Sequence, residues 1–237
     1  MRTVIADCRI SYACERALAL RGFNVIKLPP HKRLGEDIAS HPDMLLLKHG
    51  NTVITSADYC DMAPHVFSDL REYASELKIS FTSDEQRAEY PHDALFNALI
   101  MGDKIFCRRE SISPSVLALA DECGMEVIGV RQGYPACTVL ALSDSIAITA
   151  DRGMARALTE NGITVTLIEN GDIELPPHEY GFIGGAAGVF EGRVYFLGSL
   201  DAHRDKEKII DACRAAKVTP VSLSDEKLRD LGRLIFI

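Results

Sequence analysis

The sequence predicts an α/β protein built from five repeated units, each a β-hairpin followed by a helix and a third strand. Three observations lead to this fold class. Five short β-branched or apolar runs recur along the 237 residues, about 45–50 residues apart. Four of them follow a tight polar turn, and a segment with helix start and stop residues comes after each. The runs cover residues 3–6, 52–55, 104–107, 146–149 and 194–197.

Four of these runs form the second strand of a predicted hairpin. Each is preceded by another apolar run and by a turn rich in Gly, Asn, Asp or Ser, which are the residues that tight hairpin turns favour. The four predicted hairpins read MLLL-KHGN-TVIT, NALI-MGD-KIFC, VLAL-SDS-IAIT and AAGVF-EGR-VYFLG.

Helices are predicted between the second and third strands of the units. Ser11, Ser113 and Asp151 each carry a side-chain oxygen that can cap a helix N-terminus, and a proline follows Ser113. The three helices that they begin stop at glycines 22, 124 and 162, each of which precedes an apolar strand-like run. Two further helices are predicted, one between residues 61 and 77 and one over residues 206–216.

The first unit lacks one strand. Residues 3–6 have a helix and a third strand after them but no hairpin partner before them, whereas residues 233–237 form an apolar strand without a hairpin. Pairing the two segments satisfies the backbone groups of both edges and closes the ring. The alternative is that residues 233–237 form a loose edge strand or tail.

We therefore predict one domain, a five-fold pseudosymmetric α/β propeller closed by the C-terminal strand beside the N-terminal strand. A competing interpretation is a two-domain α/β protein in which the repeat is accidental. The predicted units cover about residues 1–37 plus 226–237, 38–88, 89–133, 134–178 and 179–225.

Composition and charge exclude several classes of protein. The chain has 26 Lys and Arg against 34 Asp and Glu, and a net charge of −8 argues against binding nucleic acid through phosphates. No apolar run reaches the ~18 residues that a membrane span needs. Charges at Arg2, Asp7 and Arg9 interrupt any signal-peptide-like stretch. The seven cysteines are scattered and form no C-x-x-C motif, which is typical of reduced cytoplasmic thiols. We expect a cytoplasmic protein that binds neither membranes nor nucleic acid.

Four short motifs and the five-unit architecture resemble the pentein (guanidino-group-modifying enzyme) superfamily. The motifs are His41-Pro-Asp43, Tyr90-Pro-His-Asp93 with Asn97, Gln132-Gly-Tyr134 with Cys137, and Gly181-Phe-Ile-Gly-Gly185. The superfamily includes arginine deiminase, dimethylarginine dimethylaminohydrolase and the non-enzymatic translation initiation factor 6. Within it the chain is most similar to a poorly characterised bacterial family. The match in architecture covers essentially the whole chain.

The resemblance implies a cysteine-dependent site at the mouth of a central channel. In the enzymes a Cys thiolate attacks the guanidinium carbon, a His moves protons, and carboxylates hold the cation. Carried over, Cys137 becomes the nucleophile, His41 the acid/base and Asp43 a carboxylate of the site. One departure is that Ala186 stands where the enzymes keep a substrate-binding Asp; a second is that Cys137 lies in mid-chain, as in a circularly permuted order of units. Further candidates for substrate binding are Asp93, Asn97, Gln132, Tyr134, Gly184 and Gly185.

Each candidate also has a purely structural interpretation. Cys137 in a strand is equally well a small buried hydrophobe, His41 a turn residue before a proline, and Asp43 a cap of nearby backbone N–H groups. A buried Asn97 can brace its hairpin. Gln132 and Tyr134 can belong to a loop that bends at a glycine, and Gly184 and Gly185 can allow close packing at a crowded axis.

Two functions follow from these observations. The first is a hydrolase or transferase that acts on a C–N bond of a small guanidine- or amidine-like molecule, which is polar and cationic. The alternative is a non-catalytic protein of the same fold that binds a ligand or partner, as in the initiation-factor branch. No phosphate-binding loop, dinucleotide fingerprint or metal-ligand spacing is present in the sequence, so we predict neither a cofactor nor a metal.

Overall fold

A computed structural model describes residues 2–237 of the chain. Within this range the strands form five three-stranded sheets and one two-stranded sheet. In each three-stranded sheet the middle strand pairs antiparallel with one neighbour and parallel with the other. The predicted mixed α/β class is therefore confirmed.

The three-stranded sheets are β17 (Ile235–Phe236), β1 (Arg2–Asp7) and β2 (Phe23–Leu28); β3 (Leu46–His49), β4 (Thr52–Ser56) and β5 (Lys78–Thr82); β6 (Leu99–Met101), β7 (Lys104–Cys107) and β8 (Glu126–Gly129); β9 (Val139–Ala141), β10 (Ile146–Thr149) and β11 (Thr164–Leu167); and β13 (Ala187–Phe190), β14 (Arg193–Phe196) and β15 (Thr219–Ser222). The two-stranded sheet joins β12 (Ile173–Glu174) to β16 (Leu228–Arg229).

Helices connect the middle strand of each three-stranded sheet to its parallel neighbour, as predicted. Ser11, Ser113 and Asp151 accept hydrogen bonds from the backbone N–H groups that follow them and cap their helices. The predicted helix between residues 61 and 77 is instead two helices, because Pro64 has no N–H and begins a new one. The connecting helices are α1 (Tyr12–Ala19), α3 (Ala57–Met62) with α4 (Pro64–Tyr73), α5 (Pro114–Glu122), α7 (Arg152–Glu160), and η1 (Leu200–Ala202) with α8 (Lys206–Ala215).

The two terminal strands pair with each other. β17 runs antiparallel to β1, with Val4 opposite Phe236, and Thr3 and Ile237 exchange backbone hydrogen bonds of 3.3 and 2.9 Å. The strand is shorter than residues 233–237, because Arg233 has a φ of 65° and donates its N–H to the carbonyl of Gly185. The sheets stay separate, and residues 2–237 form no single closed sheet.

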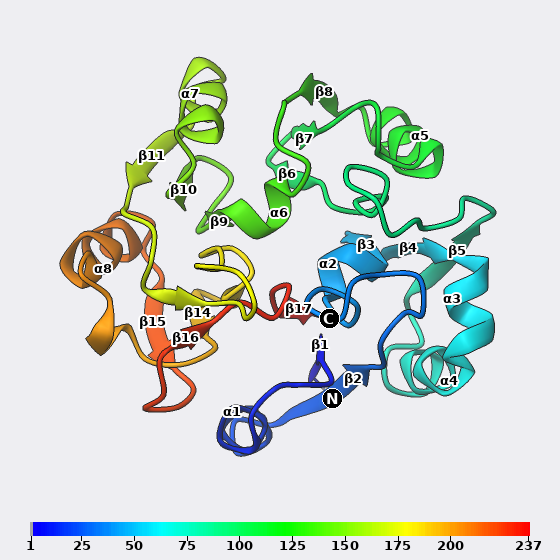
Figure 1. Cartoon of the computed structure of the whole chain (residues 1–237), viewed down its shortest axis with the longest axis horizontal. Coiled ribbons are helices and arrows are strands. Elements are labelled where there is room, and N and C mark those ends of the chain that lie inside the picture. Colours follow the sequence, from blue (N-terminus) through cyan, green and yellow to red (C-terminus); the bar gives the residue numbers. More distant parts are fainter. Residues whose placement is uncertain (1) are drawn as a thin grey trace.

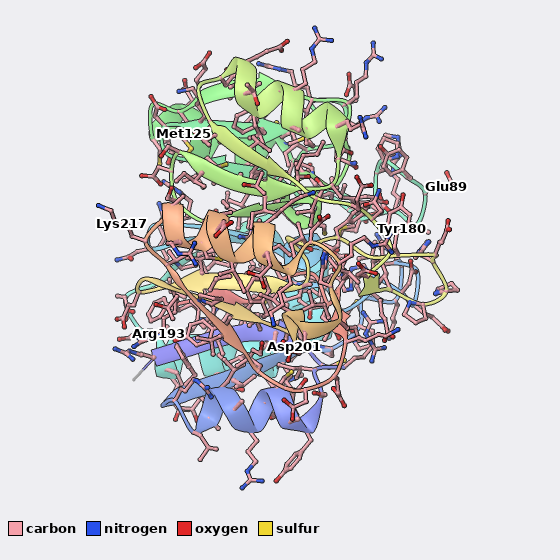
Figure 2. All side chains as sticks on the ribbon, turned by 90° about the vertical axis from the view of Figure 1, so that its left-hand side faces the viewer. Glu89, Met125, Tyr180, Arg193, Asp201 and Lys217 are labelled. Atoms are coloured by element: carbon pink, nitrogen blue, oxygen red, sulfur yellow. The ribbon has the colours of Figure 1, made fainter. Side chains whose placement is uncertain are left out.

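The connecting helices lie at the periphery, and one strand of each sheet faces the middle of the molecule (Figure 1). These inner strands are β3, β6, β9, β13 and β17. Side chains fill the space between the sheets (Figure 2), and large apolar residues such as Phe67, Phe106 and Phe196 are fully buried there. Figure 2 also places Glu89 and Tyr180 on one side of the molecule and Arg193 and Lys217 on the other.

Two one-turn helices stand where the sequence predicted the beginning of inner strands. Residues 135–138, expected in a strand, form α6 (Pro135–Thr138), and residues 42–45 form α2 (Pro42–Leu45). Both begin with a proline, whose fixed φ suits the first turn of a helix. Asn97, also expected on a strand, lies in the loop that precedes β6. Of the helices between residues 2 and 237, none is long and apolar enough to cross a bilayer.

Candidate active site

Three of the predicted site residues, Asp43, Asn97 and Cys137, lie just ahead of inner strands. Asp43 is on α2 before β3, Cys137 is on α6 before β9, and Asn97 is in the loop before β6. The contacts of Cys137 with Asp43 and Asn97 show that the segments ahead of β3, β6 and β9 meet. The one-turn helices therefore bring side chains from different units into contact.

The thiol of Cys137 is held between a carboxyl and an amide. Its Sγ donates to Oδ2 of Asp43 over 2.9 Å and accepts from Nδ2 of Asn97 over 3.2 Å. Oδ1 of the same asparagine accepts from the backbone N–H of Ala136 over 2.8 Å, which fixes the amide orientation. Cys137, Asp43 and Asn97 are all buried.

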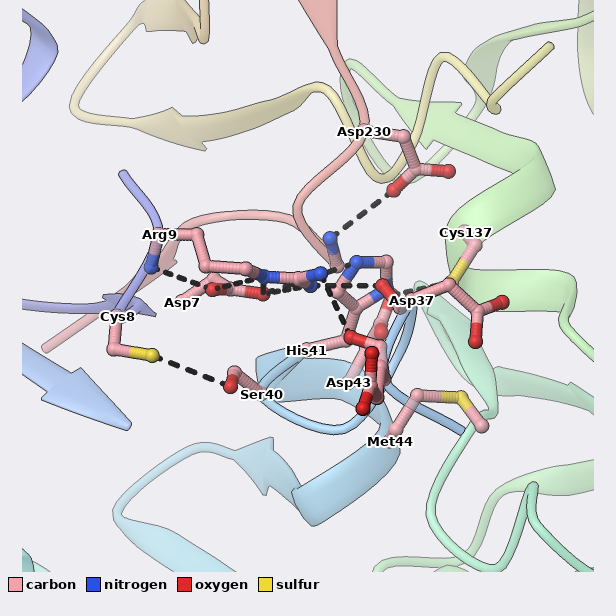
Figure 3. A network of polar contacts seen from close by, with 12 residues as sticks. Asp7, Cys8, Arg9, Asp37, Ser40, His41, Asp43, Met44, Cys137 and Asp230 are labelled. Carbon is pink, nitrogen blue, oxygen red and sulfur yellow. Dashed lines mark hydrogen bonds and ion pairs between the residues drawn. The ribbon is translucent and has the colours of Figure 1, made fainter. Parts of the chain in front are cut away.

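His41 completes a cluster with Asp43 and Cys137, called the thiol cluster below. One ring nitrogen, one carboxylate oxygen and the sulfur lie within 4.8 Å of one another. Neither ring nitrogen of the buried His41 has a hydrogen-bond partner among the residues described, and Nε2 lies 3.8 Å from Oδ2 of Asp7. Figure 3 shows these residues around one polar network. This set of donors is one that Zn²⁺ uses in proteins, so the cluster could hold such an ion.

Burial disfavours charge throughout the thiol cluster. It raises the pKa of Cys137 well above 9, and the carboxyl groups of Asp43 and Asp230 add to this shift. Burial lowers the pKa of His41 to about 3, helped by Arg9 and Arg229, and raises the pKa of Asp43 to about 6. The resting site therefore contains a neutral thiol beside a neutral imidazole.

The thiol cluster opens into a cavity of about 500 Å³. His41 and Cys137 line it, whereas Asp43 lines a second cavity. Tyr134 donates its hydroxyl to Oδ2 of Asp93 over 2.6 Å, so two further predicted residues form part of the wall. The remaining lining residues are Gly35, Asp37, Ile38, Met44, Ala88, Tyr90, Leu175, His178, Glu179, Tyr180, Phe182 and Asp230.

Asp230 is a site residue that the sequence analysis missed. Its Oδ2 accepts from the N–H of Phe182 over 2.9 Å and its Oδ1 from the N–H of Gly232 over 3.1 Å. Burial raises its pKa to about 7, although these two N–H groups oppose the shift. Asp230 precedes β17 as Asp43 precedes β3. Its position ahead of an inner strand of the repeat is therefore the sequence feature that indicates it.

The glycines ahead of β13 leave room for the site. A Cβ on Gly185 would lie 1.8 Å from Oδ1 of Asp230, and one on Gly184 would lie 2.4–2.6 Å from three backbone carbonyl oxygens, including that of Cys137. Ala186, where the resemblance implies a carboxylate in the enzymes, is fully buried in the apolar core. Asp230 supplies a carboxylate next to these glycines instead.

Gln132 is not part of this cavity. Its Nε2 donates to Asp151 over 2.7 Å and its Oε1 accepts from the N–H of Tyr134 over 3.1 Å. It lines a separate cavity beside α7. Its position supports the loop before α6, which agrees with the structural interpretation of this residue.

Comparisons with known proteins identify the fold and the family. The model of the family of unknown function DUF6873 matches residues 5–235, and no curated protein matches the chain. Among solved structures, an inosamine-phosphate amidinotransferase from Streptomyces griseus is 13% identical, with a TM-score of 0.55, over 98% of this chain and 90% of its own.

Two further solved structures have the same fold. A dimethylarginine dimethylaminohydrolase is 10% identical over 94% of this chain and 92% of its own, with a TM-score of 0.53. An agmatine deiminase from C. jejuni is 9% identical over 94% and 76%, also with a TM-score of 0.53. The predicted resemblance to the pentein superfamily is confirmed at the level of the fold. Since its model covers nearly the entire sequence, the chain belongs to the family of unknown function DUF6873.

Proposed function

We propose that this protein is a cysteine-dependent hydrolase or transferase that acts on a C–N bond of a small guanidinium- or amidinium-containing molecule. One observation carries the proposal: the thiol of Cys137 lies between the Asp43 carboxyl and the Asn97 amide at an acid-lined cavity. The five-fold propeller, closed by β17 beside β1 as one domain with the predicted units, is the architecture proposed for it.

A bound cation would activate the thiol. In the resting site, burial and two neighbouring carboxyl groups favour the neutral thiol. A guanidinium beside the sulfur supplies the opposite charge that a thiolate needs, and it pairs with carboxylates that burial otherwise disfavours. The raised pKa values of Asp43, about 6, and Asp230, about 7, would fall in the same complex.

The reaction needs no oxidant, and its only co-reactant is water or an acceptor amine. The Cys137 sulfur forms a bond to the guanidinium carbon, and the thiol proton passes through Asp43 or His41 to one nitrogen. That nitrogen leaves as an amine or ammonia when its C–N bond breaks, so a thiouronium remains on the sulfur. Water or an acceptor amine then attacks the carbon, the C–S bond breaks, and the sulfur recovers its proton.

His41 suits the proton transfers because its ring has no competing hydrogen bond. Both nitrogens lack a partner among the residues described, and Asp7 lies 3.8 Å from Nε2, where it can stabilise a transient imidazolium. Asn97 donates to the sulfur and would stabilise a thiolate more than a thiol.

The high pKa of the resting Cys137 thiol is the observation that supports the alternative, a non-catalytic binding protein. Burial keeps the pKa of Cys137 high, and an inert buried cysteine would have the same property. The two functions differ in what a bound cation does to the sulfur, and alkylation tests this directly.

The test compares 2-chloroacetamidine with 2-chloroacetamide, which have nearly the same size and leaving group but differ in charge. At neutral pH we expect the cationic reagent to modify Cys137 at least tenfold faster, as measured by peptide mass mapping. The exposed Cys8 and Cys123 serve as internal controls that should show no such preference. If Cys137 shows no greater preference for the cationic reagent than Cys8 does, the catalytic proposal is wrong.

A further inference from the structure

We infer that the cavity selects cations that carry no carboxylate, so that the substrate is a guanidinium compound with a neutral or cationic chain rather than an amino acid. This inference rests on the proposed function for the guanidinium, whereas the selection against a carboxylate rests on the cavity alone.

The charges that line the cavity have one sign. Four acidic residues line it, Asp37, Asp93, Glu179 and Asp230. Among the described residues that line it there is no Lys and no Arg, and the two histidines are His41 and His178. The second of these is already paired, since its Nε2 lies 2.5 Å from Oδ2 of Asp37. A carboxylate that enters the cavity would lose its water and gain no opposite charge.

Two arginines that contact residues of the cavity wall, Arg9 and Arg108, are engaged in other interactions. Arg9 forms a bidentate pair with Asp7, with distances of 3.0 Å from Nε to Oδ1 and 2.6 Å from Nη2 to Oδ2. Its Nη1 and Nη2 also donate to the carbonyls of Glu36 and Asp37 over 2.9 and 2.8 Å. Because four oxygen atoms of Asp7, Glu36 and Asp37 hold this guanidinium, it is not free to turn toward a ligand carboxylate.

Arg108 is held in a similar way. Its Nη1 donates to the hydroxyl of Tyr90 over 3.0 Å and to the carbonyl of Arg131 over 3.1 Å. The guanidinium carbon lies 5.4 Å from the centre of the Tyr90 ring, on which it packs. It therefore does not line the cavity, although the ring of Tyr90 does.

One buried carboxylate oxygen is available for a ligand. Oδ1 of Asp93 has no hydrogen-bond partner among the residues described, although the side chain is only 3% exposed and its Oδ2 accepts from Tyr134. An ammonium or guanidinium group would satisfy this oxygen. The rings of Tyr90, Tyr134 and Tyr180 line the same cavity and offer π faces to a cation.

The experiment uses two pairs of compounds in which only the carboxylate differs. Agmatine is arginine without its carboxylate, and 1,5-diaminopentane is lysine without its carboxylate. Binding is measured by titration calorimetry at constant ionic strength with Cys137→Ala, in which no turnover can occur. We expect each amine to bind at least tenfold more tightly than the matching amino acid.

A matched pair of variants tests the source of the selection. Glu179 lines the cavity, whereas Glu174 is exposed in the same segment and does not. Glu179→Arg adds a cation to the wall and should bring the agmatine-to-arginine affinity ratio close to one. Glu174→Arg makes the same change outside the cavity and should leave the ratio within twofold.

The outcomes separate this inference from the proposed function. If arginine binds as tightly as agmatine, and lysine as tightly as the diamine, the selection is refuted even where Cys137 proves reactive. If the diamine binds more tightly than lysine while no guanidine is bound or turned over, the selection stands and the guanidine chemistry fails. Absence of binding by all four compounds refutes the inference.

Discussion

Replacing Asp230 by Asn should stabilise the protein at neutral pH while it impairs the site. The carboxyl is completely buried and close to Asp43 and Asp7, and its pKa is raised from 3.8 to about 7. The native state therefore holds a proton at pH values where the unfolded chain has already released it. Stability contributed by this group is greatest below pH 4 and is lost as the pH rises toward 7.

The magnitude follows from the size of the shift. About three pKa units at about 1.4 kcal/mol each amount to about 4 kcal/mol of destabilisation at pH 8. At pH 4.5 the same group costs only about 1 kcal/mol, since it is protonated in the native state and only partly ionised in the unfolded chain. An amide of the same shape does not ionise, so Asp230→Asn removes this pH dependence.

Urea unfolding of the wild type and Asp230→Asn at pH 4.5, 6 and 8 measures the effect. The free energy of unfolding of Asp230→Asn, relative to that of the wild type, should increase by about 3 kcal/mol from pH 4.5 to pH 8. Asp225→Asn, at an exposed position in the same C-terminal segment, serves as the control and should show no such trend. A difference that stays flat with pH, or a variant less stable than the wild type at pH 8, would show that the two backbone N–H groups outweigh burial.

Three further predictions concern the thiol cluster and its surroundings. Asn97→Ala should cost about 1–3 kcal/mol in urea unfolding, since it leaves the buried N–H of Ala136 unpaired; Asn97→Asp should keep that bond, so a loss no smaller than that of the alanine variant would contradict this explanation. Gly184→Ala should cost at least about 2 kcal/mol, because its Cβ would meet three carbonyl oxygens. In contrast, Gly153→Ala in α7 should change stability by less than about 1 kcal/mol, and equal effects would count against the packing argument. Zn²⁺ should inhibit turnover and a chelator restore it, with calorimetry showing that Cys137→Ala binds the ion at least tenfold more weakly; undiminished binding would place the ion elsewhere.

Local signals in the sequence predicted much of the fold. Ser11, Ser113 and Asp151 cap their helices because a side-chain oxygen next to free N–H groups acts within a few residues and needs no tertiary context. The repeat added the long-range part, because each unit can bury its apolar surface only against its neighbours. Pro64 divides the helix that was predicted between residues 61 and 77, because a proline has no N–H to donate within a helix.

The candidate site was predictable only in part. His41, Asp43 and Cys137 were found through short motifs, and the structure brings them within 4.8 Å of one another. Their placement on one-turn helices was not predicted, because an apolar segment of four residues is compatible with a strand or a helix. Asp230 was missed because it belongs to none of the short motifs, and the repeat predicted only a strand for residues 233–237.

The pairing of β17 with β1 has a consequence for how the protein is made. β1 and β2 emerge from the ribosome well before the strand that completes their sheet, because residues 29–234 separate them from β17. Asp230 lies on the same late segment. Contacts of such long range form slowly, and an incomplete sheet exposes an edge in the meantime. A nascent chain would therefore carry the thiol of Cys137 without its full set of carboxyl groups, and the cavity would assemble only after synthesis has passed Asp230.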